Sequence, residues 1–230
     1  MEQSTHIHQQ NPQNPQLPQL PQTTLTLNNI SAQMQGVMLY ENVTLTLTEG
    51  AIIAVTAPNG TGKTTFLKQL AGLHHIESGD LTFCGLPINR PEDYDGKMIW
   101  LGDANGLIPT LTVQRQLEYI ATLWGQPQRL PASIHYMQLK PYLQHRVSDL
   151  SSGWKRRVAL TRLLLIPATL WILDEPFNHL DASGINLLCG LLNSHADKGG
   201  MVIFSSPDVR AIPQLPNHRI EVLELMDFIK

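Results

Sequence analysis

The feature that most constrains the fold is a glycine-rich loop between an apolar run and a run suited to a helix. Residues 51–54 read Ala-Ile-Ile-Ala, and residues 55–65 continue as Val-Thr-Ala-Pro-Asn-Gly-Thr-Gly-Lys-Thr-Thr. A loop that cradles a phosphate group turns several backbone N–H groups inward, so it needs glycine where φ is positive or where the backbone approaches the anion closely. Gly60 and Gly62 meet this need. The run therefore predicts a buried strand, a phosphate-binding loop and a helix, in that order.

The side chains of this loop also suit a nucleotide. A helix beginning near Lys63 would aim its free N–H groups and positive end at the phosphates, Lys63 would bridge the β- and γ-phosphates, and the Thr64 hydroxyl would hold Mg²⁺. Ala57 stands where the pattern G-x-x-x-x-G-K-[ST] has its first glycine; because alanine can still turn tightly, we expect weaker binding rather than none. The structural alternative is an ordinary strand-to-helix turn. The predicted nucleotide-binding residues are Ala57, Pro58, Asn59, Gly60, Thr61, Gly62, Lys63, Thr64 and Thr65.

Length and composition bound the class of protein. The chain has 230 residues, 42% of them hydrophobic, which is enough for one sizeable α/β domain with a buried core. The net charge is -3, and Lys and Arg are not gathered in a stripe, which argues against nucleic acid as the main partner. A membrane span needs about 18 uninterrupted apolar residues, and the richest run, residues 163–173, is cut by Pro167. We expect no membrane span, although such a chain can dock on a membrane protein.

The hydrophobic pattern predicts an antiparallel β region followed by a mostly parallel α/β core. Apolar residues alternate with Thr at 25–27 and 43–48, as in half-buried antiparallel strands. Continuous apolar runs further along are typical of buried parallel strands. The remaining expected strands are 79–85, 98–101, 168–173, 201–204 and 220–225, and the expected helices are 63–73, 112–124, 158–166 and 183–195. Residues 1–24 are rich in Gln, Pro and Asn and predict a disordered tail, which leaves a domain at 25–230 with a helical region at about 104–166.

Two further clusters of polar residues follow apolar or helical runs. The strand at 168–173 ends in Asp174 and Glu175, which puts two carboxylates where α/β sheets bind ligands. Asp174 can accept a hydrogen bond from Mg²⁺-bound water, and Glu175 can orient and polarise an attacking water; a capping pair before a proline is the alternative. Ser151, Ser152 and Gly153 precede the helix expected at 158–166 and offer a hydroxyl and free N–H groups as a second anion site.

These motifs, in this order, resemble those of ABC-transporter ATPases. Residues 57–65, 150–153, 170–177 and 178–181 are similar to the Walker A, signature, Walker B and D-loop motifs, and the likeness extends over residues 25–225. It implies a P-loop NTPase core of the ABC ATPase type with an antiparallel β-subdomain and a helical insert. Within the superfamily, the chain most resembles the haem-exporter ATP-binding subunits of cytochrome c maturation. This resemblance rests on the short chain and on three segments, Trp-Leu-Gly at 100–102, Arg-Arg-Val-Ala-Leu at 156–160 and Leu-Trp-Ile-Leu-Asp-Glu-Pro-Phe at 170–177.

The resemblance also implies a mechanism and partners. ATP and Mg²⁺ would be the cofactors, with Lys63, Asp174 and Glu175 as catalytic residues, and ATP would lie in a homodimer between one phosphate loop and the Ser151 to Gly153 segment of the other subunit. Integral membrane subunits of the CcmB/CcmC type would hold the dimer peripherally at the cytoplasmic face of the inner membrane. Hydrolysis would be linked to release of a haem-loaded chaperone.

Several positions depart from the family pattern. Asp103, or Ala104 beside it, stands where a Mg²⁺-contacting Gln is common, so Asp103 joins Thr64 and Asp174 as a predicted metal residue. Trp154 replaces the Gln of the signature, and Pro207 stands where the switch histidine is expected. No aromatic residue is evident where adenine stacks in this family, and Gln33 or Met34 is expected there instead.

These departures keep other functions open. The chain could be a nucleotide-responsive interaction subunit with little or no hydrolysis, or the ATPase of another ABC exporter. A non-transport ABC protein acting on ribosomes or DNA is disfavoured, because such proteins usually carry two cassettes or a long coiled-coil insert.

Overall fold

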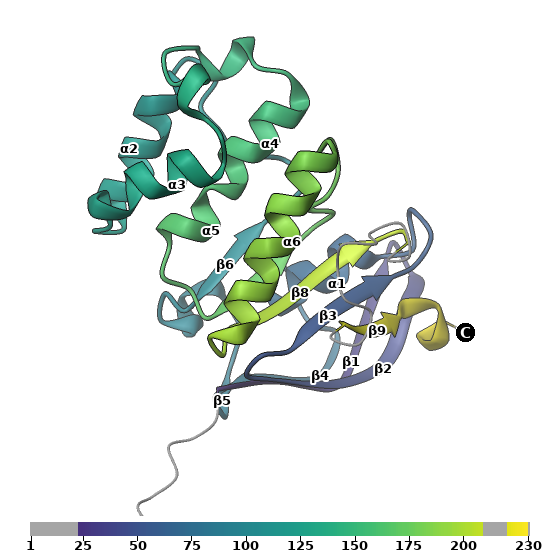
Figure 1. Cartoon of the computed structure of the whole chain (residues 1–230). Coiled ribbons are helices and arrows are strands. Elements are labelled where there is room, and N and C mark those ends of the chain that lie inside the picture. The colour runs from purple at the N-terminus through teal and green to yellow at the C-terminus, as the bar shows by residue number, and fades with distance from the viewer. Residues whose placement is uncertain (1–22, 209–219, 230) are drawn as a thin grey trace, which may run out of the picture.

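Two sheets of different strand direction form the core of the molecule (Figure 1). The computed structural model describes residues 23–208 and 220–229. The antiparallel sheet has the order β2-β1-β4-β5, made of Val37–Thr48, Thr24–Met34, Ser78–Phe83 and Leu86–Pro87. The parallel sheet has the order β6-β7-β8-β3-β9, made of Met98–Leu101, Leu170–Leu173, Met201–Ser206, Ile52–Thr56 and Ile220–Glu224. The expected combination of a parallel sheet and an antiparallel β region is confirmed.

The antiparallel pair β1 and β2 is longer than the sequence pattern indicates. Leu25 lies opposite Leu47 in the predicted alternating segments, but pairing continues to a tight turn at Gln35 and Gly36. Both turn residues have positive φ, as a two-residue hairpin requires. The pairing register shifts between Leu27 and Gln33. These irregularities interrupt the alternation of apolar and polar residues by which a strand is recognised in a sequence.

The central strands of the parallel sheet are buried along their whole length. Every residue of β3, β7 and β8 is buried, which is why their sequences are continuously apolar up to the strand ends. Side chains of β3 point alternately into two cores. Ile52 and Ala54 lie in a core with most of the helices, whereas Ile53 and Val55 lie in a core with the antiparallel sheet and the helix α1 (Lys63–Leu70). The parallel sheet is therefore the layer between two hydrophobic cores.

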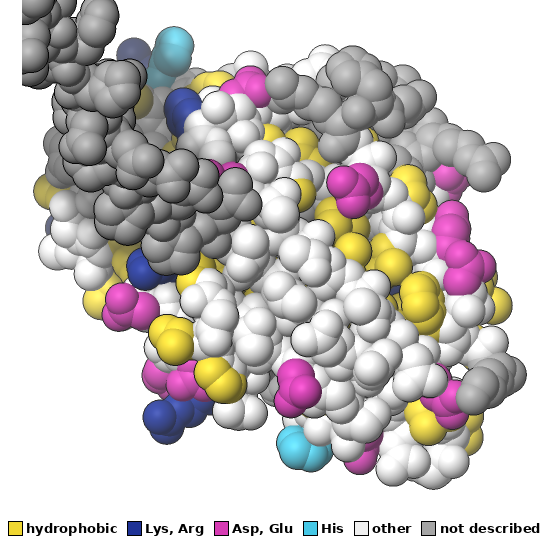
Figure 2. Space-filling model, turned by 90° about the horizontal axis from the view of Figure 1, so that it is seen from below, with side chains coloured by type: hydrophobic (Ala, Val, Ile, Leu, Met, Phe, Trp, Pro, Cys, Tyr) yellow, Lys and Arg dark blue, Asp and Glu magenta, His cyan; other side chains and the backbone are white. Residues whose placement is uncertain are grey.

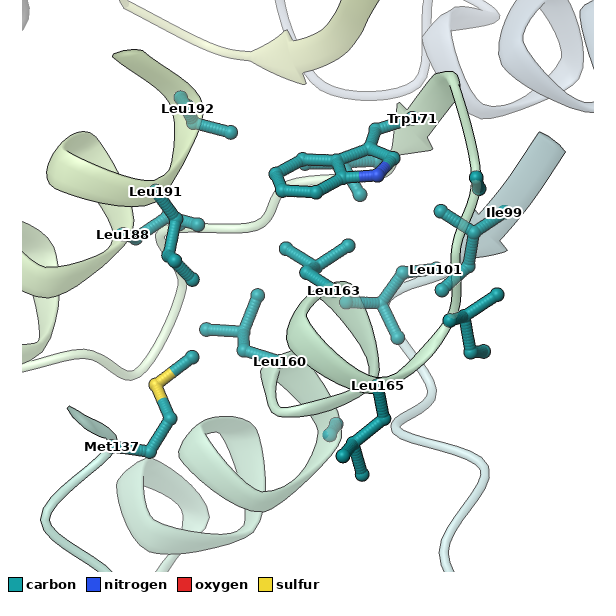
Figure 3. Close-up of a cluster of buried hydrophobic side chains, with 14 of the residues drawn as sticks. Ile99, Leu101, Met137, Leu160, Leu163, Leu165, Trp171, Leu188, Leu191 and Leu192 are labelled. Atoms are coloured by element: carbon teal, nitrogen blue, oxygen red, sulfur yellow. The ribbon is translucent and has the colours of Figure 1, made fainter. Parts of the chain in front are cut away.

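Helices lie on both faces of the parallel sheet: α1 packs on the side of the antiparallel sheet, and the other helices pack on the opposite side and extend beyond it. The α-helices are α1 (Lys63–Leu70), α2 (Val113–Leu123), α3 (Leu130–Tyr136), α4 (Ser152–Leu160), α5 (Arg162–Leu165) and α6 (Ala182–Asp197). Short 3-10 helices occur at Pro91–Tyr94, Pro127–Arg129, Lys140–Tyr142, Val147–Asp149 and Leu225–Phe228. In Figure 1, α2 to α5 gather beyond one end of the sheet, whereas α6 crosses in front of β8. Figure 3 shows Trp171 of β7 above Leu163 of α5, with Leu191 and Leu192 of α6 beside it.

The start of α2 and the end of α1 can be compared with the sequence prediction. Thr112 caps α2 as expected, because its hydroxyl accepts a hydrogen bond from the Arg115 N–H. The first helix ends at Leu70 instead of residue 73, since Gly72 adopts a φ of 67° and the terminal N–H groups turn back onto the last helical carbonyls.

The helix expected at 158–166 was placed wrongly. It begins at Ser152, because the Ser151 hydroxyl accepts a hydrogen bond from the Trp154 N–H and caps the first turn. It also breaks at Thr161, whose hydroxyl donates to the Arg157 carbonyl. The signature motif is therefore the first turn of α4 and not a loop before it.

Two expectations concern the ends of the chain and the membrane. The predicted tail at 1–24 lies almost wholly outside the described residues, and Thr24 is already the first residue of β1. Within the part of the chain that the structure describes, no helix combines the length and the apolar character needed to cross a bilayer.

Candidate nucleotide site

The glycine loop joins β3 to α1 and has the backbone that the sequence predicts. Gly60 and Gly62 have φ values of 83° and 100°, and a Cβ at Gly62 would lie 3.2 Å from the Leu39 side chain. Ala57 is buried and is not among the residues with positive φ. Alanine therefore causes no backbone strain at this position, and the departure from the usual first glycine is tolerated by the fold.

Lys63, the first residue of α1, turns its side chain back into the loop. Its Nζ donates to the carbonyls of Ala57 at 2.7 Å and Pro58 at 3.1 Å, and to the side-chain oxygen of Asn59 at 3.4 Å. Lys63 is only 5% exposed. The ammonium is thus fixed on the concave side of the loop, where a charged phosphate oxygen would be a stronger acceptor than these neutral carbonyls.

Asp174 joins three elements that are far apart in sequence. Its Oδ2 accepts a hydrogen bond from the Thr64 hydroxyl at 2.8 Å, across 110 residues, and its Oδ1 accepts one from the Ser205 hydroxyl at 2.6 Å. Asp174 is 2% exposed. The end of β7 is therefore tied to the start of α1 and to β8, and the two predicted metal residues Thr64 and Asp174 lie side by side.

Glu175 is held by its backbone and by its carboxylate. Its φ is 42°, an unusual value for a residue with a side chain. Its N–H donates to the Ser205 Oγ at 2.8 Å, and its Oε2 accepts a hydrogen bond from the Asn178 amide. Glu175 borders the same cavity of about 330 Å³ as Lys63 and Thr64. The structure thus brings the strand end and the phosphate loop to one cavity, as the sequence predicts.

The β1–β2 hairpin contributes an apolar wall to this cavity. Met34 and Leu39 line it, and Met34 is 49% exposed. Gln33, the other residue expected at the adenine position, does not line this cavity. A thioether and an isobutyl group offer a polarizable, flat-packing surface in place of an aromatic ring.

The signature residues line a second cavity, of about 250 Å³, that shares no lining residue with the first. Ser151, Ser152 and Gly153 open onto it, together with Trp154, Arg157, His179 and Asp181. A side chain at Gly153 would place its Cβ 2.7 Å from the His179 carbonyl oxygen, so glycine is required there. One chain therefore carries two separate cavities, one at the phosphate loop and one at the signature residues.

The walls of the signature cavity are fixed by charge and ring contacts. Arg157 donates to the Asp181 Oδ1 at 2.5 Å, and this hydrogen bond holds the pKa of the Asp181 carboxyl below its usual range. The Arg157 guanidinium lies over the Trp154 ring at 4.7 Å, and Trp154 packs on Tyr142 with ring centroids 4.1 Å apart. Trp154, which departs from the signature pattern, is thus part of a packed wall.

Other predicted positions lie apart from the cluster. Asp103 is exposed in the segment after β6, and its role as a metal residue stays a prediction. Pro207 is exposed directly after β8, and residues 209–219 beyond it lie outside the described part of the chain.

Two residues of the site were not identified as structural anchors from the sequence. Ser205 bridges Asp174 and Glu175, but in the sequence it is only the fifth residue of a buried strand. Arg156 is 1% exposed and contacts the same strand end, although it sits in a basic run that reads as solvated. Neither carries a local signal, because their partners come from other elements.

Comparison with known proteins decides the family. The family model described as "ABC transporter" matches residues 40–178. The chain belongs to the ABC transporter family. It is 35% identical to the cytochrome c biogenesis ATP-binding export protein CcmA of Wolbachia pipientis wMel over 79% of this chain and 88% of that protein. It is 34% identical to CcmA of Albidiferax ferrireducens over 83% of this chain and 94% of that protein.

Solved structures agree on the fold. An ABC transporter ATP-binding protein from Pyrococcus furiosus superposes with a TM-score of 0.77 at 23% identity, covering 90% of this chain and all (100%) of that one. The ATP-binding subunit of another ABC transporter gives a TM-score of 0.75 at 25% identity, covering 88% and 86%. The predicted ABC ATPase fold and the resemblance to CcmA are thereby confirmed. As a member of this family, the chain is an ATP-binding subunit with ATPase activity.

Proposed function

We propose that this ABC ATPase works as a homodimer in a cytochrome c maturation complex. The observation that carries the homodimer is the separation of its two half-sites: the phosphate loop with Glu175 lines one cavity, and Ser151 to Gly153 line another. Two copies arranged head to tail would each supply one half of two equivalent ATP sites, which a twofold axis satisfies. The curated relatives named cytochrome c biogenesis ATP-binding export protein support the assignment to this system.

In this proposal the phosphate loop binds the nucleotide and Thr64 with Asp174 holds Mg²⁺. The donor set fits, because a hydroxyl and a buried carboxylate oxygen 2.8 Å apart face the phosphate loop, and Mg²⁺ takes few protein oxygens with the rest from phosphate and water. No group of three or more His, Cys, Asp or Glu side chains gathers as a metal site in the described residues. Bound there, Mg²⁺ would neutralise charge on the phosphates.

Glu175 would act as the base that orients the attacking water. Its carboxylate borders the cavity, and the Asn178 amide holds one oxygen, so the other oxygen is available to a water molecule. Met34 and Leu39 would pack against adenine in place of the aromatic ring common in the family.

The partners would be integral membrane subunits of the CcmB/CcmC type, with the ATPase peripheral at the cytoplasmic face of the inner membrane. Tyr119 and Leu123 on α2 are 57% and 66% exposed and one helical turn apart, in the region where we expect the membrane subunits to dock. Hydrolysis would drive release of a haem-loaded chaperone. On the face shown in Figure 2, the Lys and Arg side chains of the described residues form no continuous stripe. We therefore propose no nucleic-acid partner.

Complementation between two inactive variants tests the composite sites. Lys63→Ala removes the charge aimed at the phosphates of its own site. Ser151→Arg fills the signature cavity, which in the proposed dimer contacts the nucleotide bound to the partner's phosphate loop. Each variant alone should be inactive, because every site contains one defect. In an equal mixture, half of the dimers pair the two variants and keep one intact site of two, so we expect about a quarter of the wild-type rate if the sites work independently.

An inactive mixture has two explanations that gel filtration separates. On a Glu175→Gln background, ATP should produce a stable dimer, and Ser151→Arg should prevent it. If Ser151→Arg prevents the dimer, the sites are composite but must hydrolyse ATP together. A dimer that forms equally well with Ser151→Arg would refute the head-to-tail arrangement.

A further inference from the structure

The buried guanidinium of Arg156 joins two other segments of the chain, residues 102–105 and 174–176, to helix α4. Arginine has five N–H donors, and in Arg156 all of them are used. Nε donates to the Pro176 carbonyl at 3.2 Å, Nη1 to the Gly102 carbonyl at 2.9 Å and the Asn105 Oδ1 at 3.2 Å, and Nη2 to the carbonyls of Asp174 at 2.9 Å and Glu175 at 3.0 Å. Four of the five acceptors are backbone carbonyls, so this side chain fixes the path of the main chain.

Burial of this cation is costly, so its position needs a compensating arrangement. Arg156 is 1% exposed, and burial lowers the pKa of its guanidinium, while the carboxylates of Asp103, Asp174 and Glu175 act in the opposite direction. A buried cation whose hydrogen bonds are all made is tolerated, and removing part of that network leaves buried acceptors without donors. Replacement by a shorter or neutral side chain would therefore release both segments from α4 together.

The segment that most needs this support is the backbone of Glu175. A φ of 42° places it in the left-handed region, which is strained for a residue with a Cβ. Ser205 accepts from its N–H on one side, and Arg156 donates to its carbonyl on the other. The direction of the Glu175 side chain follows from this φ, so both contacts decide where the carboxylate lies.

We propose that Arg156 is a positioning residue that aims Glu175 from the signature helix. Arg156 lies in the second turn of α4, whose first turn carries the signature residues that would serve the partner's nucleotide. A movement of α4 on closure of the dimer would pass through the guanidinium to the Glu175 backbone and to the segment after β6. The signature of one site and the base of the other are thereby linked within one chain. The inference rests on the proposed role of Glu175 as base.

Steady-state kinetics of Arg156→Gln, Arg156→Lys and a matched control test the proposal. Displacement of a reacting group by about 1 Å costs on the order of 10²-fold in rate, so Arg156→Gln should lower kcat about 100-fold while the Kd for ATP stays within about twofold. Arg156→Lys keeps the charge but has three donors and no planar fork, so its kcat should lie between those of the wild type and Arg156→Gln. Arg162→Gln is the control, since Arg162 donates to the Gly106 carbonyl of the same loop but not to residues 174–176.

Combination with Glu175→Gln separates positioning from general damage. Single-turnover hydrolysis of labelled ATP should give the same residual rate for Glu175→Gln with and without Arg156→Gln, because a base that is absent can no longer be misplaced. Equal fractional losses in both backgrounds would overturn the proposal, and so would a wild-type kcat in Arg156→Lys and Arg156→Gln. Should Arg156→Gln fail to fold, Arg156→Lys decides in the same two backgrounds. If Glu175→Gln alone retains full turnover, the proposed function is wrong in naming Glu175 as the base. That result would be distinct from a failure of Arg156 to position the residue.

Discussion

Replacement of Ser205 by alanine tests the hydrogen-bond cluster that joins the phosphate loop to the carboxyl end of β7. The Ser205 hydroxyl is fully buried, donates to the Asp174 Oδ1 at 2.6 Å and accepts from the Glu175 N–H at 2.8 Å. The substitution removes only one oxygen, so the volume of the strand and its pairing with β3 and β7 stay as they are. The change in stability therefore reports on two hydrogen bonds.

The magnitude follows from the charge and burial of the two partners. A hydrogen bond to an ionised group contributes about 1.5 to 3 kcal/mol, and a buried donor left without a partner costs about 1 to 3 kcal/mol. Asp174 keeps its second hydrogen bond from Thr64. We expect the free energy of unfolding to fall by about 3 to 5 kcal/mol, a large part of the 5 to 15 kcal/mol typical of a domain.

Urea unfolding followed by tryptophan fluorescence measures this loss, and Ser206→Ala is the matched control. Ser206 is the next residue of the buried strand β8, its side chain faces the other side of the sheet, and its hydroxyl is not part of the Asp174 cluster. We expect the control to lose about 1 kcal/mol or less. The activity of Ser205→Ala should also require more Mg²⁺ for half-maximal rate, since Asp174 is less firmly held. A loss in Ser205→Ala no larger than in Ser206→Ala would refute the reasoning.

Two further predictions concern the chemistry. Pro207→His should raise kcat under saturating Mg²⁺-ATP by tenfold or more, because one well-placed transition-state donor contributes on the order of 10² to 10³ in rate; an unchanged rate would show that this loop works by another arrangement. Glu175→Gln should keep ATP binding and stop turnover, because the amide fills the same space without accepting a proton. A titration with labelled ATP measures the affinity, and a phosphate-release assay on the same preparation measures the rate. A loss of both affinity and rate would contradict this prediction.

Motifs whose chemistry is local could be predicted from the sequence alone. Gly60, Gly62 and Lys63 lie within a few residues of one another, and the backbone each requires is the backbone that the structure has. The buried strands were predictable because a strand covered on both faces is apolar at every position, as β7 and β8 are. The ABC ATPase fold was expected because these motifs, in this order, resemble those of ABC-transporter ATPases.

The contacts between distant segments could not be predicted from the sequence. Asp174 contacts Thr64 across 110 residues and Ser205 across 31, and no periodicity in the sequence encodes such a pair. The start of α4 depended on which of several adjacent polar residues caps it, a choice made by the surrounding fold. Arg156 reads as one cation in a basic run, yet it is buried because four carbonyls and an amide oxygen from distant segments satisfy its donors at once. Long-range hydrogen bonds of this kind exist only after the chain has closed on itself, which is why local sequence reasoning does not reach them.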